Sequence, residues 1–357
     1  MKTKTQQGRA CHRYLAGTGL FVLLTSCFVS ILLLRVVAAS PGPVPRPPRP
    51  AVTKVECSSL SSAILGRSVS YCVALPEDYA ASTARYPTLY FLHGLFENER
   101  SWSERGGQEV LDSLVSQGQV GRFLVVLPDG GKTFYVNSID GHERYEDFFI
   151  QELVPAIDRT YRTVSDRRAR GISGTSMGGY GALHLGMRHP EVFGAASAQS
   201  AALLPKFPNP IPTEGRWGFY ARILQGPFGS PLNEAYWEAN SPLTLAEHPD
   251  HFANLKLYFD CGDNDRYGFE EGAALLDKIL TEKGFHHEFA LRPGNHGWSY
   301  LSQYMKYALL FHWQEFGQSS AAAARTSLKQ GAHCRGPSEP RAFRPRVVAA
   351  PFRAARW

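Results

Sequence analysis

The sequence predicts an α/β fold in which helices cover both faces of a mostly parallel, eight-stranded sheet. From residue 51 onward, short runs rich in Val, Leu, Tyr and Phe alternate with amphipathic segments of helical length. One of these runs passes into a helical segment through a serine flanked by glycines. The chain is 43% hydrophobic, so the stretch 51–316 is long enough to bury one full core.

The first 39 residues have the order of charges and side chains that export signals share. Four basic residues precede an apolar run over 20–34, and small residues follow it at 36–40. The run is shorter than the roughly 20 residues that span a bilayer, which favours a cleaved signal peptide over an N-terminal membrane anchor. A lipoprotein signal ending at Cys27 is a third alternative. Each alternative predicts that the rest of the chain lies outside the cytoplasm.

The two ends of the chain are basic and the middle is acidic. Residues 1–50 carry seven Lys or Arg and no acid, and residues 317–357 carry eight against a single Glu. The net charge of +6 therefore belongs to the ends, and no nucleic-acid partner is expected. Residues 40–50 are a proline-rich linker. The basic tail over 317–357 is predicted to be disordered.

Eight strands and five helices are expected between these ends. The strands are 53–58, 67–75, 87–92, 123–127, a short run before Ser176, 194–200, 255–261 and 287–291. The helices are 104–117, 145–161, 177–189, 269–283 and 298–316. Such alternation is typical of a parallel sheet buried on both faces.

Cys57 and Cys72 lie on the first two strands. A disulfide across these strands is conceivable in an oxidising compartment. Two small buried apolar side chains are the favoured interpretation. No spacing of Cys and His predicts a metal site, and no cofactor is expected.

The loop after the third strand contains His-Gly-Leu at 93–95. Gly94 allows the backbone to turn so that the Leu95 N–H can face a reacting carbonyl. Together with the N–H of Met177 it would form an oxyanion hole with two donors. His93 is expected to be a structural part of this turn.

The sequence Gly-Thr-Ser-Met-Gly at 174–178 stands where the fifth strand meets its helix. A tight turn of this kind holds the serine hydroxyl clear of the backbone, and its neighbours must lack side chains. The following helix directs its N-terminal N–H groups at charge that develops near the serine. The spacing predicts that Ser176 is a nucleophile for acyl transfer.

Partners for this serine are expected beyond the carboxyl ends of the other strands, because functional residues of open parallel sheets lie there. Asp263 and Asp265 follow the seventh strand, and either could orient a histidine; Asp265 is preferred. His296 lies on the tight loop after the eighth strand. The chain order Ser176, Asp265, His296 is the α/β-hydrolase order.

Four motifs taken together resemble the putative esterase family of α/β-hydrolases. They are His-Gly-Leu at 93–95 with Asn98 and Trp102 downstream, Gly-Thr-Ser-Met-Gly-Gly-Tyr-Gly-Ala at 174–182, Cys-Gly-Asp-Asn-Asp at 261–265 and Gly-Asn-His-Gly-Trp at 294–298. The resemblance covers about residues 53–316. It implies an α/β-hydrolase fold, a triad of Ser176, Asp265 and His296, and Leu95 and Met177 as oxyanion donors.

That group includes S-formylglutathione hydrolase, feruloyl, acetyl-xylan and tributyrin-type esterases, and the mycolyltransferases. Two departures matter. The second acidic residue, Asp263, leaves the identity of the acid open. The cysteine-flanked oxyanion segment of S-formylglutathione hydrolase is absent, so a glutathione thioester is a less favoured substrate.

The expected reaction is hydrolysis of short-chain, acetyl or aryl carboxylic esters, free or linked to a polysaccharide. An insertion at about 203–247 is expected to form a short cap. Its aromatic residues, Trp217 and Trp237 among them, either line an acyl pocket over Ser176 or form a satellite core. An acyltransferase of the mycolyltransferase type and a non-catalytic binding module are the alternative functions.

Overall fold

The computed structural model describes residues 53–333, with side chains described as far as residue 317. All eight expected strands are present, in one sheet with the order β1-β2-β4-β3-β5-β6-β7-β8. Their bounds are β1 Lys54–Ser62, β2 Arg67–Leu75, β3 Thr88–Leu92, β4 Leu124–Pro128, β5 Arg170–Thr175, β6 Ala195–Gln199, β7 Lys256–Gly262 and β8 Glu288–Arg292. Only β2 and its two neighbours pair antiparallel among these strands. The predicted α/β-hydrolase architecture is confirmed.

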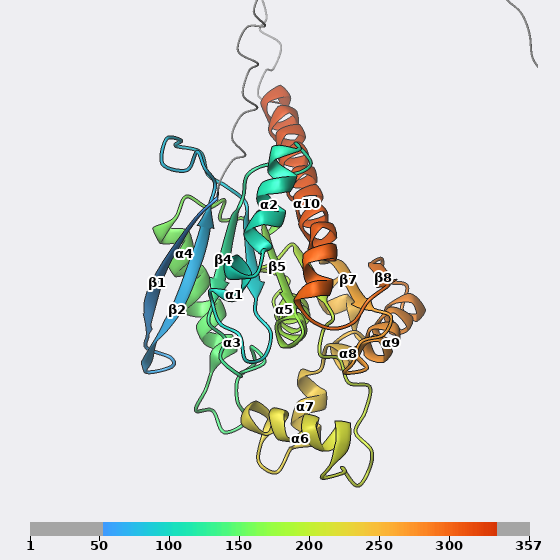
Figure 1. The fold of residues 1–357 in the computed structure, drawn as a ribbon. Helices are drawn as coiled ribbons and strands as arrows, with labels where there is room; N and C mark the ends of the chain where they lie inside the picture. Colours follow the sequence, from blue (N-terminus) through green and yellow to red (C-terminus); the bar gives the residue numbers. More distant parts are fainter. Residues whose placement is uncertain (1–52, 334–357) are drawn as a thin grey trace, which may run out of the picture. The chain divides into compact units, whose positions relative to one another are not determined.

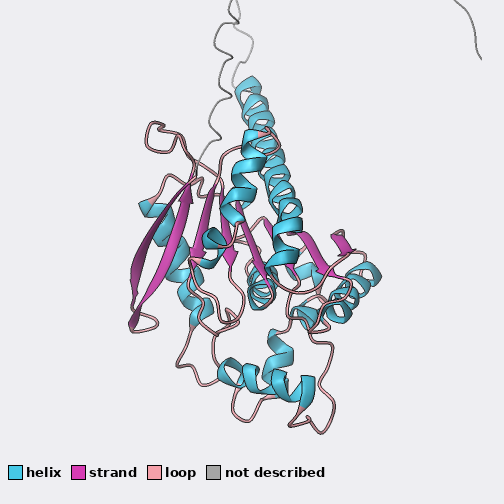
Figure 2. Cartoon of the chain, viewed as in Figure 1, coloured by secondary structure: helices cyan, strands magenta, loops and turns pink. Residues whose placement is uncertain are grey.

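Helices cover both faces of this sheet (Figure 1, Figure 2). On one face α1 (Ser101–Glu104) packs its tryptophan, and α2 (Gly107–Ser116) and α10 (Trp298–His333) pack leucines and a methionine, against the strands, where Leu89, Phe91 and Val125 belong to the same buried cluster. The other face is covered by α3 (Tyr145–Phe148), the π-helical turn η1 (Phe149–Leu153), α4 (Val154–Thr160), α5 (Met177–Arg188) and α9 (Phe269–Glu282). A short 3₁₀ turn, η2 (Arg167–Ala169), leads into β5. The central strands are therefore buried on both sides, which explains their continuous apolar runs.

The segment between β6 and β7 folds into helices α6 (Gly215–Phe228), α7 (Glu234–Asn240) and α8 (Pro242–Leu245), followed by the 3₁₀ turn η3 (Pro249–Phe252). Helices α6 and α7 lie beyond one end of the sheet, at the bottom of Figure 1. The end of α7 is attached to α5: the Tyr180 hydroxyl and Nδ1 of His184 both donate to the Asn240 carbonyl, at 2.8 and 2.9 Å.

Cys57 and Cys72 form a disulfide, so the favoured interpretation of two separate apolar side chains is wrong. The two residues are directly opposite in the register of β1 and β2, with Cα atoms 4.0 Å apart. Close opposition on neighbouring antiparallel strands brings the Cβ atoms within bonding reach. The sequence placed both cysteines on successive strands but did not give their register.

Helix α10 continues to His333, beyond the residue where a disordered tail was expected to begin. Four successive alanines at 321–324 explain the difference, because alanine has the highest helix propensity of all residues. Residues from 334 onward lie outside the described part of the chain. So do the predicted leader at 1–39, with its Cys27, and the linker at 40–50. Between residues 53 and 333 no helix is both long and apolar enough to cross a membrane.

Candidate active site

Ser176 stands between β5 and α5 in a strained backbone conformation, with φ +55° and ψ −118°. Positive φ is uncommon for a residue with a side chain and costs on the order of 1–3 kcal/mol. The glycines around it are required by space. A Cβ on Gly174 would lie 2.2 Å from the Gly178 carbonyl oxygen, and one on Gly178 would lie 2.0 Å from the Leu92 carbonyl oxygen. The motif therefore forms the expected nucleophile elbow.

His296 is hydrogen-bonded to Asp265, the acidic residue that was preferred from the sequence. Its Nδ1 lies 2.7 Å from Oδ2 of Asp265, whose side chain is fully buried. Because a carboxylate only accepts, Nδ1 carries the proton and Nε2 is left as the basic nitrogen.

The Asp265 carboxylate is itself held by further donors. Oδ1 accepts the Tyr267 N–H at 2.9 Å, and the Cys261 thiol donates to Oδ2 at 3.7 Å. Burial raises the pKa of the Cys261 thiol, so this thiol keeps its proton. The carboxylate is fixed in place by three contacts.

Asp263 has a different environment. Its Oδ1 accepts the Gly294 N–H at 3.0 Å, which joins the loop after β7 to the loop after β8. Asn295 joins the same two loops, because its Oδ1 accepts the N–H groups of Arg266 and His296 at 2.8 and 2.6 Å. Asp263 is therefore a structural residue of the loop, and it has no contact with the imidazole among the described residues.

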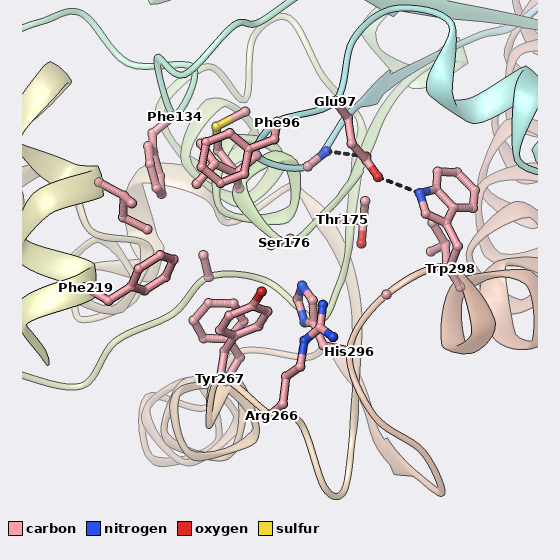
Figure 3. A pocket seen from close by; sticks show the side chains of 18 of the residues that line it. Phe96, Glu97, Phe134, Thr175, Ser176, Phe219, Arg266, Tyr267, His296 and Trp298 are labelled. Carbon is pink, nitrogen blue, oxygen red and sulfur yellow. Dashed lines mark hydrogen bonds between the residues drawn. The ribbon is translucent and has the colours of Figure 1, made fainter. Parts of the chain in front are cut away.

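Ser176 and His296 line one cavity of about 370 Å³ (Figure 3). In residues 53–317 the serine hydroxyl has no hydrogen-bond partner, and such contacts commonly tighten only when substrate binds. Leu95 and Met177 line the same cavity. Across the described chain their backbone N–H groups donate to no protein acceptor. These two donors therefore lie unpaired in the cavity that Ser176 lines, one of them at the N-terminus of α5.

Aromatic rings and three charged side chains are among the residues that line the cavity. The rings are Phe96, Phe134, Phe219, Tyr267, Phe269 and Trp298, and the charged residues are Glu97, Arg105 and Arg266. The rings of Tyr267 and Phe269 also pack edge-to-face with the His296 ring, with centroids 4.7 and 5.4 Å away. The sequence analysis did not identify Phe134 or Glu97 as site residues. Glu97 could have been identified, because it is a charged residue only two positions after the proposed oxyanion donor Leu95.

Trp217 and Trp237, which the sequence assigned either to the pocket or to a satellite core, do not line the cavity and belong to an aromatic cluster instead. Both pack on Phe207, with ring centroids 5.4 and 5.1 Å apart, and Trp237 is buried. The cap instead reaches the cavity through Phe219 and Ile223, which are four residues apart on α6 and share one face. The aromatic content of the insertion suggested the tryptophans, whereas the rotation of α6 about its axis decides whether Trp217 or Phe219 faces the serine.

His93 has the structural role that the sequence analysis expected. It is buried; Nε2 accepts the Gly130 N–H at 2.9 Å, and Nδ1 donates to the Gly94 carbonyl at 2.8 Å. His312 is also buried, with Nε2 2.9 Å from the Ser197 hydroxyl, and burial lowers its pKa to about 3. In the described residues no group of three His, Cys, Asp or Glu side chains is placed to hold a metal ion.

Comparison with known proteins adds independent observations. The model of a family described as Putative esterase matches residues 62–312. A stretch of 137 residues is 36% identical to an endo-1,4-beta-xylanase/feruloyl esterase of Xylanibacter ruminicola, covering 36% of this chain and 19% of that protein. A Mycobacterium tuberculosis esterase is 31% identical over 244 residues, which are 63% of this chain and 51% of that protein.

Among solved structures, a ferulic acid esterase superposes with a TM-score of 0.64 at 28% identity. The match covers 74% of this chain and 99% of that one. The chain thus spans about half or less of the two curated relatives but nearly all of this solved structure.

Proposed function

Because the chain belongs to the putative esterase family, we propose that it is a serine carboxylesterase acting through Ser176, His296 and Asp265. One observation carries this proposal: a serine in a strained elbow shares a cavity with a histidine whose Nδ1 is bound to a buried carboxylate. Strain of this kind persists where the surrounding structure enforces it, and it is common at catalytic residues.

The proposed reaction has two halves. Nε2 of His296 takes the proton of the Ser176 hydroxyl while Oγ attacks the ester carbonyl, and the carbonyl oxygen becomes an oxyanion bound by the N–H groups of Leu95 and Met177. The imidazolium then gives the proton to the departing alcohol, which leaves an acyl-enzyme. Water attacks this acyl group by the same route in reverse and releases the acid. Asp265 keeps the proton of the neutral imidazole on Nδ1 and stabilises the imidazolium.

The cavity favours acyl groups that are flat and apolar. Six aromatic rings and Ile223 are among the residues that line this cavity of about 370 Å³, which has room for a small aryl or short-chain acyl group. Relatives named as feruloyl or ferulic acid esterases support aryl esters as substrates. We include esters linked to polysaccharides, because one such relative also carries a xylanase name.

Water is proposed as the acceptor and the outside of the cytoplasm as the location. Water at about 55 M competes well with a weakly bound alcohol, and only strong positioning of an acceptor could offset its concentration. Export is supported by the leader pattern and by the Cys57–Cys72 disulfide, because disulfides persist in oxidising compartments.

The test uses the full chain and a graded set of 4-nitrophenyl and methyl esters, from acetate to decanoate, with methyl ferulate and methyl cinnamate as aryl members. We expect kcat/KM to be highest for the aryl and short-chain esters, and free acid to be the main product in the presence of millimolar glycerol or xylo-oligosaccharide. Transfer product in excess of free acid would favour the acyltransferase alternative. No hydrolysis of any member would favour the binding module. Fractionation of cells that express the full chain tests location, and activity confined to the cytoplasm would contradict export.

A further inference from the structure

We infer that Glu97 is a positioning residue whose carboxylate ties the turn bearing the Leu95 N–H to the loop bearing His296. Oε2 accepts the Gly94 N–H at 2.9 Å, and Oε1 accepts the indole N–H of Trp298 at 2.5 Å (Figure 3). Trp298 follows His296 by two residues. The inference rests on the proposed function, because it concerns the geometry of a reaction at Ser176.

The turn over 94–97 needs such support because it is strained and lies beside Ser176. Phe96 has φ +66° and its side chain is largely exposed, so nothing buried holds this residue in the left-handed region. A Cβ on Gly94 would lie 3.6 Å from the Cβ of Ser176. The turn is closed by the Glu97 N–H, which donates to the Gly94 carbonyl at 3.2 Å, and again by the Glu97 carboxylate on the Gly94 N–H. The second closure opposes relaxation of the strained residue, which would rotate the Leu95 N–H away from the serine.

The charge of Glu97 must also be contained, because a free carboxylate beside an oxyanion would oppose its formation. Each carboxylate oxygen faces one N–H donor, and the Arg105 guanidinium lies 3.8 Å from Oε1. The side chain is only 14% exposed. Charge-assisted hydrogen bonds in this setting are stronger than neutral ones, so the carboxylate can hold both segments at once.

An amide at this position could not replace the carboxylate. The two donors approach different oxygens, and glutamine offers one oxygen and one NH₂ group, which would face an N–H donor. Glu97→Gln therefore keeps at most one of the two ties, Trp298→Phe removes only the indole tie, and Glu97→Ala removes both. If these two hydrogen bonds fix the position of the Leu95 N–H relative to His296, the variants should lower kcat rather than raise KM.

The experiment measures kcat, KM and the affinity for an arylboronic acid, which adds the serine Oγ to boron and so resembles the tetrahedral intermediate. We expect kcat to fall about 100-fold in Glu97→Ala, the scale of losing one oxyanion donor, and about 10-fold in Glu97→Gln and Trp298→Phe. KM should change less than about threefold, and boronate affinity should fall in step with kcat. Adding Trp298→Phe to Glu97→Ala should cost nothing further, because both act through the same carboxylate.

Glu99→Gln is the matched control. Glu99 is two residues away with a side chain 13% exposed; it pairs with Arg100 at 3.6 Å and does not line the cavity. Its variant should keep wild-type kcat and boronate affinity.

Wild-type kcat in both Glu97 variants would overturn the inference. So would a loss of kcat at unchanged boronate affinity. Should Glu97→Ala fail to fold, the Glu97→Gln and Trp298→Phe pair decides by the same criteria. Failure of the proposed function is a separate result, seen in the wild-type protein as fluorophosphonate labelling at a residue other than Ser176.

Discussion

The loops that carry the proposed catalytic residues are held together by different contacts from those of the cap helices. The loops after β5, β7 and β8 are fixed by short polar contacts, such as the Asp265–His296 bond and the Asn295 bridge. The cap helices α6 and α7 pack through a cluster of aromatic rings around Phe207, in addition to the two hydrogen bonds that α5 donates to the Asn240 carbonyl. Substitutions in the loops should therefore change the chemistry, and substitutions in the cap should change either stability or selectivity.

Ser176→Ala gives the largest effect on the loop side of this comparison. We expect kcat to fall on the order of 10⁶-fold, as for other triad nucleophiles, with the fold preserved. Activity on 4-nitrophenyl acetate and labelling by a fluorophosphonate measure the loss, and circular dichroism checks the fold. A variant that keeps more than about a tenth of the activity would remove Ser176 from the mechanism.

Asp265→Asn should be next, at roughly 10⁴-fold, because an amide favours the wrong tautomer of His296. Asp263→Asn is the matched comparison, since this neighbouring carboxylate holds only the Gly294 N–H. Its loss in kcat should stay below about tenfold. The opposite ranking of the two variants would transfer the acid role to Asp263.

Trp237→Ala tests whether the cap depends on packing. The side chain is 3% exposed and packs on Phe207, so truncation should lower the free energy of unfolding by about 3–5 kcal/mol. The ratio of kcat/KM for aryl and acetyl esters should not change. Chemical denaturation measures the first quantity and the ester series the second. A changed ratio of kcat/KM at wild-type stability would mean that Trp237 contacts the substrate.

Phe219→Ala should have the smallest effect in free energy, and that effect should differ between two ester substrates. Its side chain lines the cavity, so kcat/KM for methyl ferulate should fall about tenfold more than for 4-nitrophenyl acetate, or about 1.4 kcal/mol of discrimination. Equal losses on both esters would mean that the ring supports the cap without contacting the acyl group.

The difference between local loop geometry and tertiary packing also explains what could be predicted from the sequence. The eight strands follow from apolar runs, and Ser176, Asp265 and His296 follow from loop motifs, whose backbone geometry is local. The disulfide depends on the register of β1 and β2, which is set by the whole sheet. The choice of Phe219 over Trp217 depends on the rotation of α6, which is set by tertiary packing. The role inferred for Glu97 needs Trp298, a residue about 200 positions away, so no local motif contains it.

The attachment of the cap to α5 affects how this protein can diverge. Tyr180 and His184 both donate to the backbone carbonyl of Asn240, and every amino acid supplies that acceptor. Substitution at position 240 therefore leaves the acceptor in place. The cap can accumulate changes in its cavity-facing residues while its end remains fixed to the helix that follows the nucleophile. A lineage of such enzymes could thus exchange one ester preference for another by single replacements on α6, without first rebuilding the catalytic loops.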